Sequence, residues 1–468
     1  MDFDAALPWS PSSSIHAPDN SRHIIPTPLR EPMPTILPPL KFKVVDLFCG
    51  AGGLSEGFRQ AGCTIVAGVD HDPDAVATYA HNFPEAEAIC GDVRQAAVRK
   101  RIMEVAAGCE VVVGGPPCQA FSQVRNHVRL IDDGRNSLYR EFVTIVQALQ
   151  PAMFVMENVP GMDQMGVRDQ IEEDLAIGGR YSVRSKKLDA ADFGVPQTRE
   201  RLIFIGVRRD LGFEVPEVKG TGAVQRTALV RTMIGGKVEY VVTSSGEMQD
   251  RLALEDPNNT SVTTVEQAIS DLHGLKAGNR ADSLPYSQLA APQSEYQRRM
   301  RDSSSHILTN VQVPRMIEDT RLRLRAIPDG GNYRDLPENL QARYITGEKW
   351  GQHNGSGKLT RKHYYAYRRL HRGIWAWTLN TKADAAYHYA VPRALSVREF
   401  ARLQSFPDRF TFTTDARKGA LPGRIDGGAA HSRYRQVGNA VPPLLAYAIA
   451  CTLQGALVEA ENARTRTA

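Results

Sequence analysis

Short apolar runs alternate with amphipathic segments between Lys41 and about Arg209. Five apolar runs have the length and composition of buried strands: 42–48, 64–70, 110–115, 152–159 and 201–207. Helical periodicity covers 54–62, which ends at Gly62, and 73–83, which has Pro73 in its first turn. Apolar strands separated by such helices predict an α/β fold with a doubly wound, mainly parallel sheet.

This alternation fades after about Asp210. Residues 215–390 are polar and loop-rich and predict a second, smaller and irregular domain, whereas 396–406 and 439–460 again have helical patterns. The first 40 residues are rich in Pro and Ser and lack periodicity, which is typical of a disordered tail. The expected organisation is a tail at 1–40, a first domain at 41–214 completed by 432–458, a second domain at 215–431 and a tail at 459–468.

The net charge and the clustering of basic residues indicate which classes of partner the protein can bind. The 468 residues carry a formal net charge of +5 with a pI near 8.8, which permits a polyanionic partner. Residues 359–372 (LTRKHYYAYRRLHR) combine five basic residues with three Tyr and no acid, a mixture that suits a phosphate backbone and base stacking. Neither a membrane-length apolar run nor a signal peptide is found, so a cytoplasmic protein without a membrane partner is expected.

The six cysteines show no CxxC spacing, and no H-E-x-x-H helix occurs. A reducing compartment is therefore expected, and a metal site is not. The unusual cysteine is Cys118, which follows two prolines in GGPPCQAFS directly after the apolar run Val111–Val113.

A cofactor pocket is indicated by DLFCGAGGLSEGF, residues 46–58. It reads as a strand, a glycine turn and a helix, and the next strand ends 20 residues past Gly50 in Asp70, which could accept ribose hydroxyls. The dinucleotide pattern G-x-G-x-x-G fails at its third glycine, which is Ser55. A nucleoside without phosphates therefore fits better, and S-adenosylmethionine is the obvious one. Asp92, at a third strand end, is expected beside the adenine amino group.

The carboxyl ends of parallel strands share one edge of a sheet, so Asp46, Asp70, Asp92, Cys118 and Glu157 are expected to converge there. In this order, FCGAGG, GDV, GPPCQAFS, ENV, QTRERLIFIG, RALSVRE and QVGNAVP resemble the DNA (cytosine-5)-methyltransferases, bacterial type, over about 44–210 and 391–443. The resemblance implies a Rossmann-like methyltransferase fold of class I, with S-adenosylmethionine as cofactor and a discontinuous first domain.

The resemblance also implies roles for the reactive residues. The Cys118 thiolate would add to C6 of a flipped cytosine, after which C5 attacks the methyl group, loses its proton and expels the cysteine. Glu157 would bind N3 and the exocyclic amine, Arg201 would hold O2, and Arg199 would help to fix the thiol and Glu157. Cofactor contacts carry over to Phe48, Gly50, Ala51, Gly52, Gly53, Asp70, His71, Asp92, Val93, Pro117, Leu138, Asn439, Ala440 and Val441.

Double-stranded DNA is the implied partner. In the family the loop equivalent to 119–137 closes over DNA, which implies contacts by Gln119 and Ser122, and the target-recognition region occupies the place of 215–390. Phosphate contacts are expected from Arg325, Arg368 and Arg369. A monomer with a role in restriction-modification or orphan methylation, near the nucleoid of a bacterium, is expected. A partner endonuclease is possible, and a tRNA methyltransferase of the same family or a catalytically silent DNA-binding relative stays open as an alternative.

Overall fold

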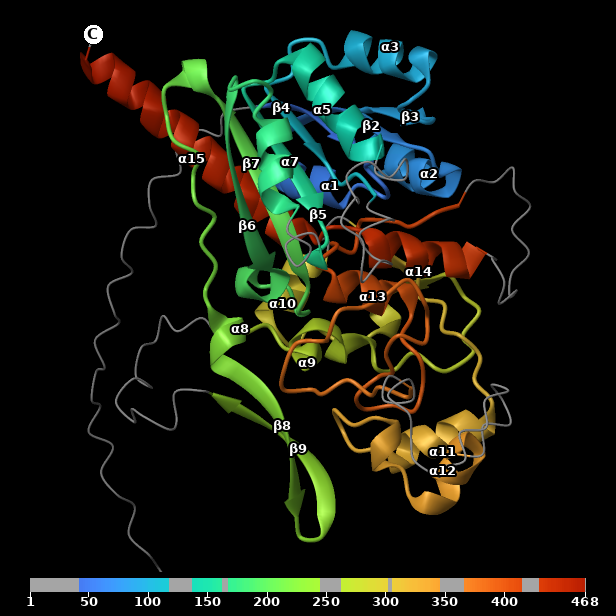
Figure 1. Cartoon of the computed structure of the whole chain (residues 1–468). Coiled ribbons are helices and arrows are strands. Elements are labelled where there is room, and N and C mark those ends of the chain that lie inside the picture. The colour runs from blue at the N-terminus through green and yellow to red at the C-terminus, as the bar shows by residue number, and fades with distance from the viewer. Residues whose placement is uncertain are drawn as a thin grey trace, which may run out of the picture. The chain divides into compact units, whose positions relative to one another are not determined.

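Seven strands form one sheet in the order β3-β2-β1-β4-β5-β7-β6 (Figure 1). The computed structural model describes residues 42–117, 137–161, 167–244, 262–301, 305–345, 366–414 and 429–467. The strands of this sheet are β1 Lys43–Leu47, β2 Thr64–Asp70, β3 Glu87–Cys90, β4 Val111–Gly114, β5 Met153–Asn158, β6 Tyr181–Asp189 and β7 Glu200–Arg208.

The helices of the described residues are α1 Gly53–Gln60, α2 Pro73–Asn82, α3 Ala96–Val105, α5 Ser137–Leu149, α7 Arg168–Leu175, α8 Ala223–Arg226, α9 Val265–Ile269, α10 Glu295–Met300, α11 Glu318–Ala326, α12 Glu338–Ile345, α13 Val397–Leu403, α14 Ala429–Asn439 and α15 Pro443–Thr467. The five strands and the two early helices predicted from the sequence are all present, so the predicted α/β fold is confirmed.

The strand directions explain how the sheet makes a site. Strands β1 to β5 run parallel, whereas β7 pairs antiparallel with both β5 and β6. Because β7 runs the other way, its first residues lie at the edge where the parallel strands end. The strand β6 was not predicted, because its sequence YSVRSKKLD is polar and lies at the edge of the sheet.

Alternate residues of each strand enter two separate cores, as a doubly wound sheet requires. On one face, Val44 and Val155 pack with Leu54 and Phe58 of α1 and with the apolar residues of α15. On the other face, Val45 and its strand neighbours pack with residues of α3, α5 and α7. The sheet is therefore buried on both sides, and only its edges are left for chemistry.

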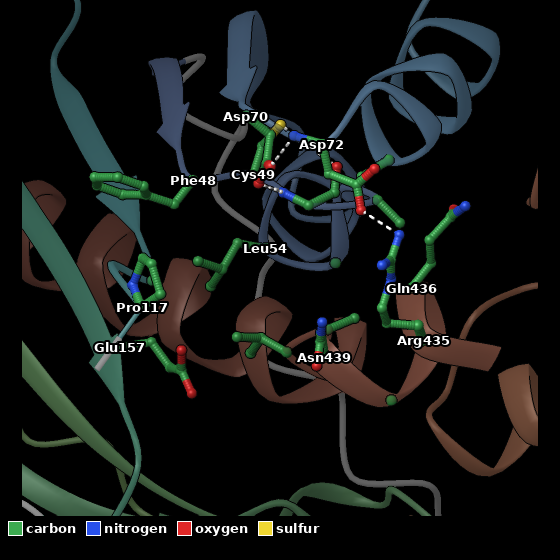
Figure 2. A pocket seen from close by; sticks show the side chains of 18 of the residues that line it. Phe48, Cys49, Leu54, Asp70, Asp72, Pro117, Glu157, Arg435, Gln436 and Asn439 are labelled. Atoms are coloured by element: carbon green, nitrogen blue, oxygen red, sulfur yellow. Dashed lines mark hydrogen bonds and ion pairs between the residues drawn. The ribbon is translucent and has the colours of Figure 1, made fainter. Parts of the chain in front are cut away.

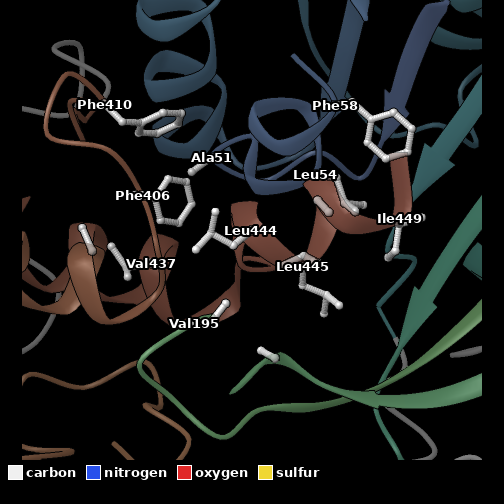
Figure 3. Packing of buried hydrophobic residues seen from close by; sticks show 14 of the residues in the cluster. Ala51, Leu54, Phe58, Val195, Phe406, Phe410, Val437, Leu444, Leu445 and Ile449 are labelled. Atoms are coloured by element: carbon white, nitrogen blue, oxygen red, sulfur yellow. The ribbon is translucent and has the colours of Figure 1, made fainter. Parts of the chain in front are cut away.

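Helices α1 and α15 approach each other unusually closely (Figure 3). A Cβ atom on Gly57 would lie 2.4 Å from the Cβ of Ala446 and from the backbone oxygen of Pro443. A Cβ atom on Gly53 would lie 2.2 Å from the backbone oxygen of Val441. These two glycines let the end of the chain dock against the turn that follows β1.

The C-terminal helical region differs from the expectation of one helix over 439–460. It consists of α14, which ends at Asn439, and α15, which begins at Pro443 and continues to Thr467. Pro442 and Pro443 cause the break, because proline starts a helix well but cannot continue one. The stretch His431–Ala460 is long and apolar enough to cross a membrane, but a core helix passes the same test, and α15 is packed against α1.

The region after β7 contains more structure than its loop-rich sequence predicts. Strands β8 (Thr227–Ile234) and β9 (Lys237–Ser244) form an antiparallel hairpin, and β10 (Ser283–Pro285) pairs with β11 (Ile307–Thr309). The side chains of β8 and β9 are mostly exposed or half-buried, so the hydrophobic signal of these strands is weak.

The segment RALSVRE folds into a buried ionic cluster around α13. The guanidinium of Arg393 binds both carboxylate oxygens of Glu399 at 2.7 and 2.8 Å. Arg402 makes the same paired contact with Asp408 at 2.7 and 2.9 Å and reaches Asp271 at 2.5 Å. Because removing one member would leave a buried charge without a partner, this segment has a structural role.

We expect the α1–α15 contact to tolerate no extra atom. Gly57→Ala should lower the free energy of unfolding by ~1–3 kcal/mol, as overpacking of a core does. The matched control is Gly455→Ala in the partner helix α15, where an added Cβ meets nothing within 4 Å. This variant should be stabilised by up to ~1 kcal/mol through helix propensity. Denaturant unfolding of both variants measures the difference, and equal effects would contradict this packing argument.

Candidate active site

The turn after β1 is shaped by its glycines. Phe48, Gly50 and Gly52 all have positive φ, at 59°, 53° and 99°. A Cβ on Gly52 would lie 2.5 Å from the ring of Phe83, whereas nothing lies within 4 Å of the corresponding position on Gly50. Gly52 thus packs the turn onto α2, and Gly50 leaves open space above it for a ligand.

Asp70 is held rigidly beside this turn. The N–H of Gly50 donates to Oδ2 of Asp70 at 2.9 Å, and the N–H of Asp72 donates to Oδ1 at 2.9 Å. Burial raises the pKa of Asp70, but hydrogen bonds from His71, Asp72 and Gly50 outweigh it, so the net pKa is lowered. Asp70 is therefore a fixed carboxylate acceptor, as hydroxyl recognition requires.

A pocket of about 580 Å³ opens at this edge of the sheet (Figure 2). Its volume lies within the usual range for small-molecule sites, roughly 300–1,000 Å³. Its walls come from the β1 turn, the end of β2, the end of β5, the start of β7 and the residues around the α14–α15 break. The lining residues predicted from the sequence are Phe48, Gly50, Ala51, Gly53, Asp70, His71, Pro117, Glu157, Arg199, Arg201, Asn439, Ala440 and Val441.

Glu157 and Arg201 form an ion pair in the pocket wall. Nε of Arg201 lies 2.6 Å from Oε1 of Glu157, and both side chains are about seven-eighths buried, at 12% and 13% exposure. The antiparallel course of β7 brings them together, because Arg201 is the second residue of that strand and Glu157 is next to last in β5. A Cβ on Gly115 would lie 2.7 Å from Oε2 of Glu157, so this glycine gives the carboxylate its place.

Arg199 is a buried cation at the same wall. Its guanidinium donates to the backbone oxygens of Leu379 at 3.3 Å and Gly438 at 2.7 Å, while its Nε has no partner. Burial lowers the pKa of Arg199, and the neighbouring Arg201 lowers it further. Among the described residues no carboxylate forms an ion pair with Arg199, so an anion placed beside it would be favoured electrostatically.

Four predicted cofactor residues do not line this pocket: Gly52, Asp92, Val93 and Leu138. Asp92 forms an ion pair with Arg94 at 2.5 Å, and hydrogen bonds from Arg94 lower its pKa to about 2. Val93 is buried in the core beside α3 and α5, and Leu138 packs against that core. The adenine contacts of Asp92 and Val93 stay predictions.

The predicted DNA contacts lie elsewhere in the chain. Arg369 donates to the backbone oxygens of Ile327 at 2.6 Å and Leu324 at 3.3 Å, Arg368 stacks on Trp377 at 4.0 Å, and Arg325 pairs with Glu318 at 2.6 Å. These contacts give the three arginines structural partners, and their phosphate contacts stay predictions. Cys118, Gln119 and Ser122 lie outside the described residues.

Two parts of the site were not assigned a role from the sequence. The buried amide of Asn158 donates to the backbone oxygen of Pro116 at 3.2 Å and accepts from the N–H of Val159 at 2.8 Å. It therefore ties the turn that leads to Cys118 to the end of β5. The second part is Thr378–Asn380, which lines the pocket although the sequence places it far from the other walls.

A buried carboxyl supports the glycine turn from below. Oδ2 of Asp46 accepts from the hydroxyl of Ser55 at 2.7 Å and from its N–H at 3.2 Å, and Ser55 contacts the hydroxyl of Tyr79 at 2.9 Å. Oδ1 of Asp46 has no partner. Burial, only partly offset by the Ser55 hydrogen bonds, raises the pKa of Asp46 to about 7.

A Rossmann-like sheet with an antiparallel seventh strand, and a nucleoside-sized pocket at its carboxyl edge, define a class I methyltransferase fold. Residues 42–455 match the family described as C-5 cytosine-specific DNA methylase. The chain therefore belongs to this family and is a DNA (cytosine-5)-methyltransferase.

Individual proteins with the same kind of name are similar to this chain over most of its length. Over 89% of this chain and 100% of its own length, the type II methyltransferase M.AgeI of Thalassovita gelatinovora is 33% identical. The type II methyltransferase M1.HphI of Haemophilus parahaemolyticus is 32% identical over 87% of this chain and 85% of its own. The fold is shared with a protein assigned as a DNA modification methyltransferase, encoded within an E. coli prophage, at a TM-score of 0.61 and 24% identity over 89% of this chain and 99% of the other.

The raised pKa of Asp46 predicts a pH dependence of stability. A carboxyl whose pKa is higher in the folded state than in the unfolded state contributes stability below pH 4 that is lost as the pH rises through about 7. Asp46→Asn should remove this trend, which is worth at most about 4 kcal/mol. Denaturant unfolding of both proteins at pH 5, 6, 7 and 8 measures it, and parallel pH profiles would contradict the assignment to Asp46.

Proposed function

We propose that Cys118 is the nucleophile of this methyltransferase and that the pocket binds S-adenosylmethionine. The observation that carries the proposal is the wall formed by Glu157, Arg199 and Arg201, which adjoins Pro117, the residue before Cys118. The thiolate adds to C6 of the extruded cytosine, C5 then takes up the methyl group, and the proton at C5 leaves before the C6–S bond breaks. The cofactor supplies the electrophilic methyl group.

The pocket residues fit the cofactor. Asp70 offers a fixed carboxylate to the ribose hydroxyls, and the open space above Gly50 lets the methionine part approach the backbone. The N-terminal end of α1 favours the cofactor carboxylate, because free N–H groups gather there. Asn439, Ala440 and Val441 close the pocket from the C-terminal side.

The charges of the wall suit an anionic nucleophile and an electron-rich ring. Arg199 is buried without an ionic partner among the described residues, so it favours the thiolate form of a neighbouring cysteine. Arg201 and Glu157 hold each other at 2.6 Å and so present a donor and an acceptor in one fixed orientation. Arg201 donates to O2 of cytosine, and Glu157 accepts from the exocyclic amine. N3 is itself an acceptor, so its bond to Glu157 requires a proton between the two.

The relatives, which are named type II methyltransferases and come from bacteria, support a proposal about the wider biological setting. We infer a monomer in the bacterial cytoplasm, associated with the nucleoid, that methylates a specific duplex sequence for a restriction-modification system or as an orphan enzyme. Residues 215–431 serve as the target-recognition domain, and Gln119, Ser122, Arg325, Arg368 and Arg369 contact DNA.

The nucleophile is tested by covalent trapping. On a duplex that carries 5-fluorocytosine at the methylated site, C5 has no proton to lose, so the protein should stay bound covalently through Cys118. Cys118→Ala should form no adduct and should leave no 5-methylcytosine in cells, as read by bisulfite sequencing, while cofactor binding is kept. If a labelled methyl group of the cofactor were transferred to tRNA but not to duplex DNA, this result would instead favour the RNA-directed alternative.

Arg199 is tested through the pH dependence of the reaction. Arg199→Met removes the buried cation, so the pKa of Cys118 should rise and the acidic limb of the single-turnover rate should move to higher pH. Each unit of this shift lowers the thiolate fraction at neutral pH about tenfold. Arg199→Lys keeps the charge and should restore part of the wild-type profile. A slower rate with an unchanged profile would give Arg199 only a structural role.

A further inference from the structure

The β8–β9 hairpin is a two-stranded ribbon with eight paired positions. Its turn, Gly235–Gly236, has φ values of 56° and 78°, the positive values that a tight two-residue hairpin turn requires. A ribbon of two strands is only marginally stable by itself, so its attachment to the rest of the chain decides how much of it is held in place.

Only the half of the ribbon near its base is anchored. Leu229 and Val242 pack against Ile374 and Trp375. Asp335, whose side chain is fully buried, accepts from Arg231 at 2.9 Å and from the hydroxyl of Tyr240 at 2.8 Å. Beyond this pair, the three residues of each strand that lead to the turn, 232–234 and 237–239, make no side-chain hydrogen bond or ion pair with other described residues. The ribbon projects away from the body in Figure 1.

The projecting half carries large apolar side chains in water. Met233 and Ile234 are 59% and 49% exposed, and they lie on opposite faces because they are neighbours in one strand. Val230 and Val241, a cross-strand pair on the Ile234 face, lie on the base side of Arg231 and Tyr240 and extend the apolar surface, at 44% and 38% exposure. Exposed apolar residues grouped in this way mark a surface that contacts another molecule.

Charge and position both point to duplex DNA as that molecule. Arg231, Arg334 and Lys237 are exposed around the ribbon, and Glu239 is exposed beside them. Arg231 is paired with the buried Asp335, so these three basic and two acidic residues leave a net charge of +1 and the surface there is weakly cationic. Arginine and lysine bind phosphates and fix register, while apolar side chains contact thymine methyl groups or enter between base steps. A major groove about 12 Å wide admits a two-stranded ribbon.

The ribbon is also joined directly to the active site. Trp375, which holds its base, precedes Ala376, and Ala376 exchanges backbone hydrogen bonds with Pro196 at 2.9 Å and Thr198 at 2.8 Å, next to Arg199. The same segment continues into Thr378–Asn380 in the pocket wall. The six residues Trp375–Asn380 span at most roughly 18 Å. The tip lies five residues beyond Leu229, roughly 17 Å further along the strand. It is therefore at most about 35 Å, or about ten base-pair steps, from the pocket wall.

We propose that the tip of the β8–β9 ribbon, carried by Met233 and Ile234, enters a groove of the substrate duplex within about one helical turn of the methylated cytosine and contributes to site selection. This inference rests on the proposed target-recognition role of residues 215–431. Arg231, Arg334 and Lys237 contact the phosphates on either side and set the depth of entry.

The experiment compares a tip variant, Met233→Ala with Ile234→Ala, with the matched control Ile307→Ala, which removes a 55% exposed apolar side chain from β11. Bisulfite sequencing of DNA from cells that express the wild type first gives the methylated sequence. Affinity for that duplex and for an unrelated duplex is then measured for all three proteins, together with cofactor affinity, melting temperature and sedimentation.

The tip variant should keep cofactor affinity, melting temperature and sedimentation, and should bind the methylated sequence about 5- to 100-fold more weakly, the range for losing contacts to one base pair. Its affinity for the unrelated duplex should change much less, so its selectivity falls, and Ile307→Ala should match the wild type. Unchanged selectivity of the tip variant would overturn the proposal. A change in its sedimentation without a change in DNA affinity would also overturn it, because the ribbon would then be a contact between two copies of this chain. Failure of the proposed function is distinguishable, because the wild type would then leave no methyl mark.

Discussion

The close contact between α1 and α15 is the constraint on which the site depends. Gly53 and Gly57 leave room for the backbone around Val441 and Pro443, so residues almost 400 positions apart in the sequence lie within van der Waals distance. The break between α14 and α15 falls at this contact, and it places Asn439, Ala440 and Val441 over the glycine turn. The pocket therefore forms only when α15 has docked onto α1.

The pocket combines two kinds of support. At the cofactor end, the supports are short hydrogen bonds between main-chain groups and a single carboxylate, Asp70, and they need no partner from later in the chain. At the reactive end, they are charged side chains whose positions depend on distant segments. Arg199 is held by the carbonyls of Leu379 and Gly438. These hydrogen bonds offset the free-energy cost of burying its charge, and only the complete fold supplies them.

The buried ionic cluster around α13 explains a segment that carries no chemistry. Arg393, Glu399 and Arg402 are fully buried, and their partners include Asp271, which lies 131 positions from Arg402. The cluster fixes α13 between α9 and α14, and α14 in turn carries one wall of the pocket. An ionic cluster of this kind requires a defined geometry, because a displaced partner would leave a charge without compensation in the core.

The sequence by itself determined the sheet, the glycine turn and most of the pocket residues, because apolar runs and strand-end positions are local signals that need no partner. It did not reveal β6 or the hairpin, whose side chains are half-exposed and weakly patterned, nor the break at Pro442–Pro443 inside a continuous apolar stretch. The antiparallel course of β7, the ion pair of Arg201 with Glu157 and the entry of Thr378–Asn380 into the pocket were decided only by tertiary structure. Direction and proximity between distant segments arise from the packing of the whole sheet, and no periodicity within one segment records them.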